Sequence, residues 1–257
     1  MTTGVDKVAM TRHDMPRYHG KPRIYIIASQ PRSGSHYLAY LLRETRKAGV
    51  PLEYFHPRHW QDWMKRCRTE NPQYAFKLLC QLRSTSNGWF GVKAHWHQFA
   101  HAISMDLDRE LAGATYIYLS RNDILDQAIS HAIALQTGVW IGGQKPVAPP
   151  VFSVDRITES IRFMLNEREQ WERFFAYTGN TPHRIYYEDL VANVNSDMTG
   201  VCKVLGIEWT LPTSINRPPA IQRTGLNAEW RTRFHQVLGG RYDDFWKREF
   251  LGTAKVA

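Results

Sequence analysis

The sequence predicts an α/β protein in which a central parallel sheet is flanked by helices on both faces. Short runs of β-branched and aromatic residues, typical of strands buried on both faces, alternate with segments in which apolar residues have helical spacing. Strands that alternate with helices in this way pair in parallel. The 257 residues contain no internal repeat and no long linker. We therefore expect a polar N-terminal arm over residues 1–21, followed by a single domain over residues 22–257.

The first strand, loop and helix form the clearest unit of the chain. Residues 23–28 have the pattern of a buried strand, and a helical pattern that begins near Tyr37 continues to about Lys47. Gly49 supplies the stop signal for this helix. Between the strand and the helix lies the loop Gln30-Pro31-Arg32-Ser33-Gly34-Ser35.

The remaining elements follow the same alternation. In chain order we expect strands over 90–94 and 115–119, a helix to about Leu135, a loop over 138–150, a long amphipathic helix over roughly 154–177 and a strand over 184–187. The apolar face of the long helix is formed by Ile157, Ile161, Met164, Leu165, Trp171 and Phe175. Ligands of such sheets bind beyond the carboxyl ends of the strands, where we expect the loops after Ala28, Ala94 and Leu119 to converge.

The charge balance favours an anionic partner. Lys and Arg number 33 against 24 Asp and Glu, which gives a formal net charge of +9. A positive field attracts nucleic acid, a membrane surface and a nucleotide alike. The basic residues are spread along the chain rather than clustered, and this argues against nucleic-acid binding.

Hydropathy and cysteine content set further expectations. No stretch approaches the roughly 18 apolar residues of a membrane span, and the first residues lack the apolar region of an export signal. We therefore expect no membrane span and a cytoplasmic location. Cys67, Cys80 and Cys202 are too few and too far apart for a disulfide framework or a zinc site. We expect reduced thiols and no metal.

The loop after the first strand has the features of an anion site. Its backbone N–H groups and the dipole of the following helix are suited to a phosphate or a sulfate. A nucleotide-hydrolysing P-loop requires a lysine after its second glycine, whereas Ser35 and His36 follow Gly34 here. Arg32 would supply the positive charge instead, and Ser33 and Ser35 would add hydroxyl donors. The loop alone is equally compatible with a plain turn that begins a helix.

Two later segments carry further candidate anion ligands. Arg121 follows the strand over 115–119, and Ser130 lies on the next predicted helix; together they can hold a second phosphate. The turn Arg223-Thr224-Gly225 precedes a C-terminal helix. Taken alone, Arg121 is equally compatible with a surface ion pair, Ser130 with helix packing, and the turn with a simple helix entry.

The order and spacing of these segments resemble the sulfotransferases that use 3′-phosphoadenosine-5′-phosphosulfate (PAPS). The first loop looks like their 5′-phosphosulfate loop, Arg121 with Ser130 looks like their 3′-phosphate site, and the turn at Arg223 looks like their late nucleotide-covering loop, with Thr224 in place of a lysine. The resemblance covers most of residues 22–235 and implies a P-loop-like fold. It implies that PAPS is bound by Arg32, Ser33, Gly34, Ser35, His36, Arg121, Ser130, Arg223, Thr224 and Gly225.

Within this superfamily the chain is most similar to the bacterial trehalose 2-sulfotransferases, whose relatives are often labelled lipopolysaccharide sulfotransferases. The segments that carry this likeness are Gln30–Ser35, Glu53–Phe55, Asp126–Ser130 and Gln136–Trp140. The likeness implies an acceptor hydroxyl on a carbohydrate or glycolipid, and it suggests a homodimer. The expected acceptor-binding residues are Tyr54, Phe55, Trp96, Gln136 and Trp140.

The resemblance leaves two candidate bases for the acceptor hydroxyl. Glu53 matches the catalytic glutamate of the bacterial family, and His95, in Lys93-Ala94-His95, matches the histidine of cytosolic sulfotransferases. We expect Glu53 to act, with apolar neighbours that raise its pKa by desolvation, although an imidazole titrates near neutral pH without such help. Lys93 would assist Arg32 in stabilising the leaving phosphate without Mg²⁺. Each candidate base also has an interpretation without catalysis: Glu53 as a surface carboxylate, and His95 as a histidine that completes its hydrogen bonds at the end of a strand.

We therefore predict an enzyme that transfers a sulfuryl group from PAPS to a hydroxyl and leaves 3′,5′-adenosine bisphosphate (PAP), with no metal. One alternative is a nucleotide kinase or NTPase with a degenerate phosphate loop, which lacks the usual loop lysine here. The other is a basic nucleic-acid-binding domain, for which the chain lacks a clustered basic stripe.

Overall fold

The computed structural model describes residues 8–210, 225–239 and 249. Contacts divide the chain into two compact units. The first unit comprises the residues up to 122 together with 163–220, and the second comprises residues 123–162 together with those from 221 onward. The single domain expected over residues 22–257 stays a prediction.

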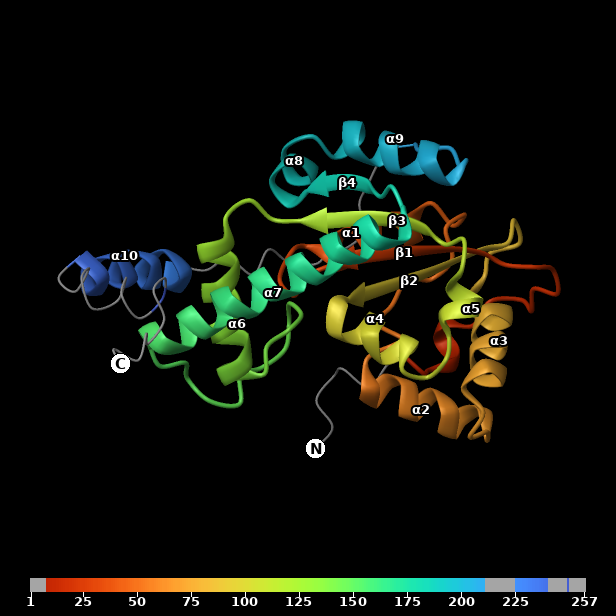
Figure 1. The fold of residues 1–257 in the computed structure, drawn as a ribbon, viewed down its shortest axis with the longest axis horizontal. Helices are drawn as coiled ribbons and strands as arrows, with labels where there is room; N and C mark the ends of the chain where they lie inside the picture. Colours follow the sequence, from red (N-terminus) through yellow and green to blue (C-terminus); the bar gives the residue numbers. More distant parts are fainter. Residues whose placement is uncertain (1–7, 211–224, 240–248, 250–257) are drawn as a thin grey trace. The chain divides into compact units, whose positions relative to one another are not determined.

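The first unit contains four parallel strands in the order β2-β1-β3-β4, drawn as arrows in Figure 1. They are β1 (Arg23–Ser29), β2 (Trp89–His95), β3 (Thr115–Ser120) and β4 (His183–Tyr186). The predicted α/β fold with a central parallel sheet is confirmed, with small differences at the strand ends. In the register of the sheet, Ser29 is paired with both His95 and Leu119. The loops after β1, β2 and β3 therefore leave the sheet at one edge.

The helices of the first unit connect these strands. They are α1 (Ser35–Glu44), α2 (Pro57–Cys67), α3 (Pro72–Arg83), α4 (Trp96–Ile103), α5 (Asp108–Leu111), α8 (Tyr187–Ala192) and α9 (Val194–Leu205), with a 3-10 turn over Thr11–His13. Neither α2 nor α3 is predicted from the sequence. Each has proline at its start, where the missing N–H is not needed by the helix.

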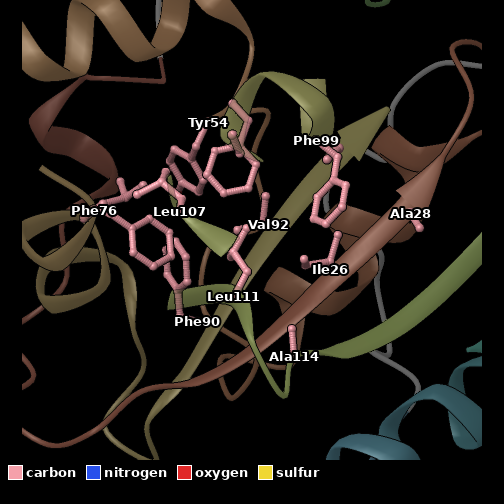
Figure 2. Packing of buried hydrophobic residues seen from close by; sticks show 14 of the residues in the cluster. Ile26, Ala28, Tyr54, Phe76, Phe90, Val92, Phe99, Leu107, Leu111 and Ala114 are labelled. Carbon is pink, nitrogen blue, oxygen red and sulfur yellow. The ribbon is translucent and has the colours of Figure 1, made fainter. Parts of the chain in front are cut away.

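Side chains of the sheet are buried on both faces. Along β1, Ile26 and Ala28 belong to one apolar cluster, which includes residues of α2, α3, α4 and α7 (Val154–Thr178) (Figure 2). Tyr25 and Ile27 belong to the other cluster, with residues of α1, α8 and α9. This alternation follows from the two-residue period of a strand. Helices therefore cover both faces, as the predicted fold requires.

An extended segment before α2 runs beside the outer edge of β2. Leu52 forms a parallel bridge with Val92, and the N–H of Lys93 donates to the carbonyl oxygen of Leu52 at 3.0 Å. This pairing fixes the backbone of the next residue, Glu53, beside the end of β2. A residue 40 positions away in the sequence is thereby brought next to Lys93.

The second unit contains α6 (Ile124–Thr137), α10 (Gly225–Gly239) and the start of the long helix α7 (Val154–Thr178). Its apolar core includes Ile129, Ile157, Trp230 and Phe234. The segment over 138–150 contains neither helix nor strand, which confirms the predicted loop. The long predicted helix is confirmed as α7.

Candidate active site

The loop after β1 turns sharply into α1. Gly34 has φ +86°, in the left-handed region that favours glycine, and Ser35 is the first helical residue. Within the described residues, no backbone carbonyl accepts from the N–H of Ser35 or His36. In the same part of the chain, the buried hydroxyl of Ser33 has no hydrogen-bond partner. The predicted anion loop therefore has donors that a bound phosphate or sulfate would satisfy.

Gly34 is also required by a close approach. A Cβ at this position would lie 2.2 Å from Cδ2 of Tyr187. We expect Gly34→Ala to lower the melting temperature through two effects, this clash and the strain of about 1–2 kcal/mol that the left-handed backbone imposes on a residue with a Cβ. Gly113 has φ +78° but no atom within 4 Å of such a Cβ, so Gly113→Ala isolates the backbone effect. Equal melting shifts for the two variants, measured by thermal denaturation, would mean that the Tyr187 contact is unimportant.

Two guanidinium groups lie at this loop. Arg121, directly after β3, donates from Nη1 to the carbonyl oxygen of Arg32 at 3.4 Å. Its guanidinium also lies 5.0 Å from the ring centre of Tyr187, and its Nε lies 3.7 Å from Glu188. Burial, followed by the positive charge of Arg121, lowers the pKa of Arg32 to about 10. A bound anion would relieve the repulsion between the two groups.

Lys93 and Glu53 form an ion pair at the end of β2. Lys93 Nζ donates to Glu53 Oε1 and lies 3.1 Å from Nε2 of His36. Glu53 Oε1 lies 3.6 Å from Nε2 of His36 and 3.8 Å from Nε2 of His95. The structure thus brings together both candidate bases, the predicted Lys93 and His36, in the first turn of α1. We call these four residues the Glu53 cluster.

The pKa shift expected for Glu53 from its sequence neighbours is wrong. Burial alone would raise the pKa of Glu53, but the charges of Lys93, His95 and His36, together with the hydrogen bond from Lys93, hold it well below its ordinary value. Burial lowers the pKa of His95 to about 3 despite the opposing charge of Glu53. At neutral pH Glu53 is therefore ionised and His95 is neutral.

Two residues that the sequence did not single out hold the candidate bases in place. Gln98, in the first turn of α4, donates from Nε2 to Glu53 Oε2 at 2.9 Å, and its Oε1 accepts from the N–H of His95 at 3.2 Å. Ser29 Oγ lies 3.1 Å from Nδ1 of His95. A glutamine three residues after a helix cap is a known capping signal, so the pattern could have pointed to Gln98. Ser29 carries no comparable signal.

Comparison with known proteins identifies the family. Residues 24–237 match the family described as Stf0 sulphotransferase. The chain belongs to this family. It is therefore a sulfotransferase, an enzyme that transfers sulfuryl groups, and the predicted family and enzyme class are confirmed. This assignment overturns the two alternatives, a kinase or NTPase and a nucleic-acid-binding domain.

Two curated relatives of this sulfotransferase are each 26% identical to it. One is the trehalose 2-sulfotransferase of Mycolicibacterium smegmatis, aligned over 257 residues that cover 84% of this chain and 95% of the relative. The other is the trehalose 2-sulfotransferase of Mycobacterium tuberculosis, aligned over 254 residues that cover 82% of this chain and 94% of the relative.

Two solved structures are less similar to this chain in sequence. The sulfotransferase domain of the Synechococcus PCC 7002 olefin synthase has a TM-score of 0.49 and 16% identity, covering 85% of this chain and 90% of that one. A retinol dehydratase in a complex with retinol and PAP has a TM-score of 0.47 and 15% identity, covering 89% and 81% respectively.

Several residues expected to bind the acceptor are packed inside the sulfotransferase instead. Tyr54 and Phe55 are fully buried, and Figure 2 shows Tyr54 among the apolar side chains of the core. The hydroxyl of Tyr54 donates to the carbonyl oxygen of Val50 at 2.6 Å. Trp96 is half-buried, and its ring packs 5.3 Å from that of Trp171. Tyr54 and Phe55, two of the expected acceptor-binding residues, are therefore core residues, because their rings pack in the apolar cluster on one face of the sheet.

Other predicted site residues lie in the second unit or outside the described residues. Gln136 donates to the carbonyl oxygen of Ala132 at 3.0 Å and accepts from the N–H of Val151 at 2.9 Å, so its side chain holds the loop that follows α6. The ring of Trp140 lies 5.9 Å from that of His131. Of the remaining four, Ser130 lies on α6 and Gly225 begins α10. Arg223 and Thr224 lie outside the described residues.

The described residues offer neither a metal-binding cluster nor a membrane-spanning helix. No group of three or more His, Cys, Asp or Glu side chains there is arranged to hold a metal ion. No helix in that part of the chain combines the length and the apolar character needed to cross a bilayer. The cytoplasmic location and the homodimer stay predictions.

Proposed function

We propose that this sulfotransferase transfers the sulfuryl group of PAPS to a hydroxyl of a carbohydrate or glycolipid. The observation that carries the proposal is the contact of 3.1 Å between Lys93, the partner of Glu53, and His36, which lies in the first turn of α1 directly after the anion loop. It joins a site for the anionic donor to a carboxylate that can take a proton. The names of the two curated relatives support a carbohydrate acceptor.

The residues of the loop fit an anionic donor. The N–H groups of Ser35 and His36 and the hydroxyl of Ser33 would donate to its 5′ end, and Arg32 would neutralise charge that builds up on the leaving phosphate. PAPS, when bound, supplies the activated sulfuryl group. Arg121 is proposed for the 3′-phosphate, because its guanidinium lies at the loop. Ser130, Arg223, Thr224 and Gly225 are proposed for the nucleotide on the family resemblance.

Glu53 is proposed as the base, and Lys93 as the cation beside it. An ionised carboxylate can accept the proton of the acceptor hydroxyl directly. The low pKa of Glu53 makes it a weak base, so the proton moves as the hydroxyl oxygen bonds to sulfur and becomes acidic, not before. Lys93 is then free to interact with the negative charge that leaves with the nucleotide.

Nucleotide selectivity tests the proposed donor. If Arg121 binds a 3′-phosphate, PAP should bind at least tenfold more tightly than AMP, because a charge-assisted hydrogen bond contributes about 1.5–3 kcal/mol. Isothermal titration calorimetry with PAP, AMP and ATP measures this directly. Equal affinities for PAP and AMP would remove PAPS as the donor.

A matched pair of arginine variants serves as the control. Arg32 has φ +62° and Arg46 has φ +55°, and Arg46 is exposed on the surface after α1. Each alanine variant removes one guanidinium from a left-handed position, so their effects on backbone strain and total charge match. We expect Arg32→Ala to weaken PAP binding and Arg46→Ala to leave it unchanged.

A further inference from the structure

A buried carboxylate holds a partly exposed histidine next to the Glu53 cluster. Glu167, on α7, is 1% exposed, and its Oε1 lies 3.1 Å from Nδ1 of His97. The same carboxylate accepts the N–H of Trp96 at 2.7 Å and the N–H of His97 at 3.1 Å. By contrast, the side chain of His97 is 44% exposed.

These contacts fix both the ring and its hydrogen-bonding role. A carboxylate only accepts hydrogen bonds, so Nδ1 of His97 carries a proton and, in the neutral ring, Nε2 is an acceptor. Within the described residues, no side chain or backbone group forms a hydrogen bond with this Nε2. Capping of α4 accounts for the two backbone bonds of Glu167 but not for its third bond, to the ring. A buried carboxylate is costly, so its use to orient one imidazole points to a function for that imidazole.

His97 lies near Glu53 and His95, the two candidate bases. Its ring centre lies 5.9 Å from that of His95, whose Nε2 is 3.8 Å from Glu53. His36, which directly follows the anion loop, belongs to the same cluster. His97 thus belongs to the surroundings of Glu53 without taking part in the loop that binds the donor.

We propose that His97 binds the acceptor, with its Nε2 accepting a hydrogen bond from a second hydroxyl of the carbohydrate whose first hydroxyl Glu53 deprotonates. Glu167 is a positioning residue, because it acts only through the ring of His97. The inference rests on the proposed function, since a second hydroxyl requires a polyhydroxylated acceptor. His97 would then favour a carbohydrate over an acceptor with a single hydroxyl.

Two substitutions of His97 separate binding from structure. In His97→Asn the side-chain amide can still donate to Glu167, but nothing replaces Nε2. In His97→Gln the amide reaches the position of Nε2. The assay measures transfer of radioactive sulfate from PAPS to trehalose, maltose and methyl α-glucoside, with PAP affinity measured separately by calorimetry.

We expect His97→Asn to raise the KM of the accepted sugar about tenfold, the effect of one lost hydrogen bond. His97→Gln should recover most of this loss, and PAP affinity should be unchanged in both variants. An unchanged sugar KM in His97→Asn, or an equal loss of PAP affinity, would overturn the proposal. If the unsubstituted enzyme binds PAP but sulfates none of the three sugars, the carbohydrate acceptor is wrong and this proposal falls with it.

Discussion

Replacing Glu53 with glutamine is expected to lower the turnover of sulfuryl transfer by at least about a hundredfold, because a positioned base contributes about 10²–10⁴-fold to such a step. Glutamine has nearly the same shape and keeps an oxygen for Lys93, so the fold should survive. It cannot accept the proton of the acceptor hydroxyl. PAP affinity should not weaken, since the substitution removes a negative charge beside an anion site. The measurements are turnover with PAPS and calorimetric binding of PAP.

His95→Asn is the matched comparison for the other candidate base. Its amide can keep a hydrogen bond to Ser29, which lies 3.1 Å from Nδ1 of His95. We expect a smaller loss of turnover than in Glu53→Gln, because His95 reaches the cluster only at 3.8 Å. A hundredfold loss in His95→Asn, with Glu53→Gln still active, would move the base to His95.

The second large effect is expected on stability. Lys93 is 1% exposed and Glu53 is its partner, so Lys93→Met leaves a carboxylate without its counter-charge. Breaking a buried pair in this way costs about 3–5 kcal/mol. We expect a loss of this size in the free energy of unfolding at pH 7, measured by chemical denaturation.

The stability difference between the native enzyme and Lys93→Met should depend on pH with a defined sign. In the native enzyme the pKa of Glu53 lies well below its ordinary 4.5, so its contribution is present above that value and is lost as the pH falls through the lowered pKa. Without Lys93, burial raises the pKa of Glu53. Protonation of Glu53 at low pH then removes the unpaired buried charge and reduces the stability loss of Lys93→Met. The difference should therefore be largest near pH 7 and shrink toward pH 4.

A double variant controls for the change in packing. Glu53→Gln combined with Lys93→Met replaces the charged pair with neutral groups of similar size, and such replacements are often neutral or stabilising. It should recover most of the stability that Lys93→Met alone loses at pH 7. A double variant as unstable as the single one would mean that the loss comes from packing rather than from charge.

The sequence by itself determined the elements that local patterns encode. Strand runs buried on both faces, the loop at Gly34 and the long helix α7 follow from side-chain period and turn chemistry, which act over a few residues. The proposed anion loop could be predicted for the same reason. Arg32, Ser33 and Ser35 lie in one short loop between a strand and a helix, so their proximity needs no knowledge of distant contacts.

Only the tertiary structure decided what surrounds the candidate base. Glu53 meets Lys93 because Leu52 is bridged to Val92, and no local pattern encodes pairing across 40 residues. That contact reverses the pKa shift expected from the sequence neighbours of Glu53. On α7, Leu165 is exposed rather than buried as predicted, and Glu167 is buried.

The same distinction explains why the expected acceptor-binding residues could not be assigned from sequence. Apolar rings such as Tyr54 and Phe55 have the same sequence signal whether they face a ligand or the core, and burial depends on which helices cover the sheet. Local physics fixes what a segment can form, whereas packing of segments far apart in the chain fixes the charge, burial and partners of each side chain within it. In this sulfotransferase, local sequence is sufficient to form the anion loop over Gln30–Ser35, whereas packing of distant segments assembles the Glu53 cluster.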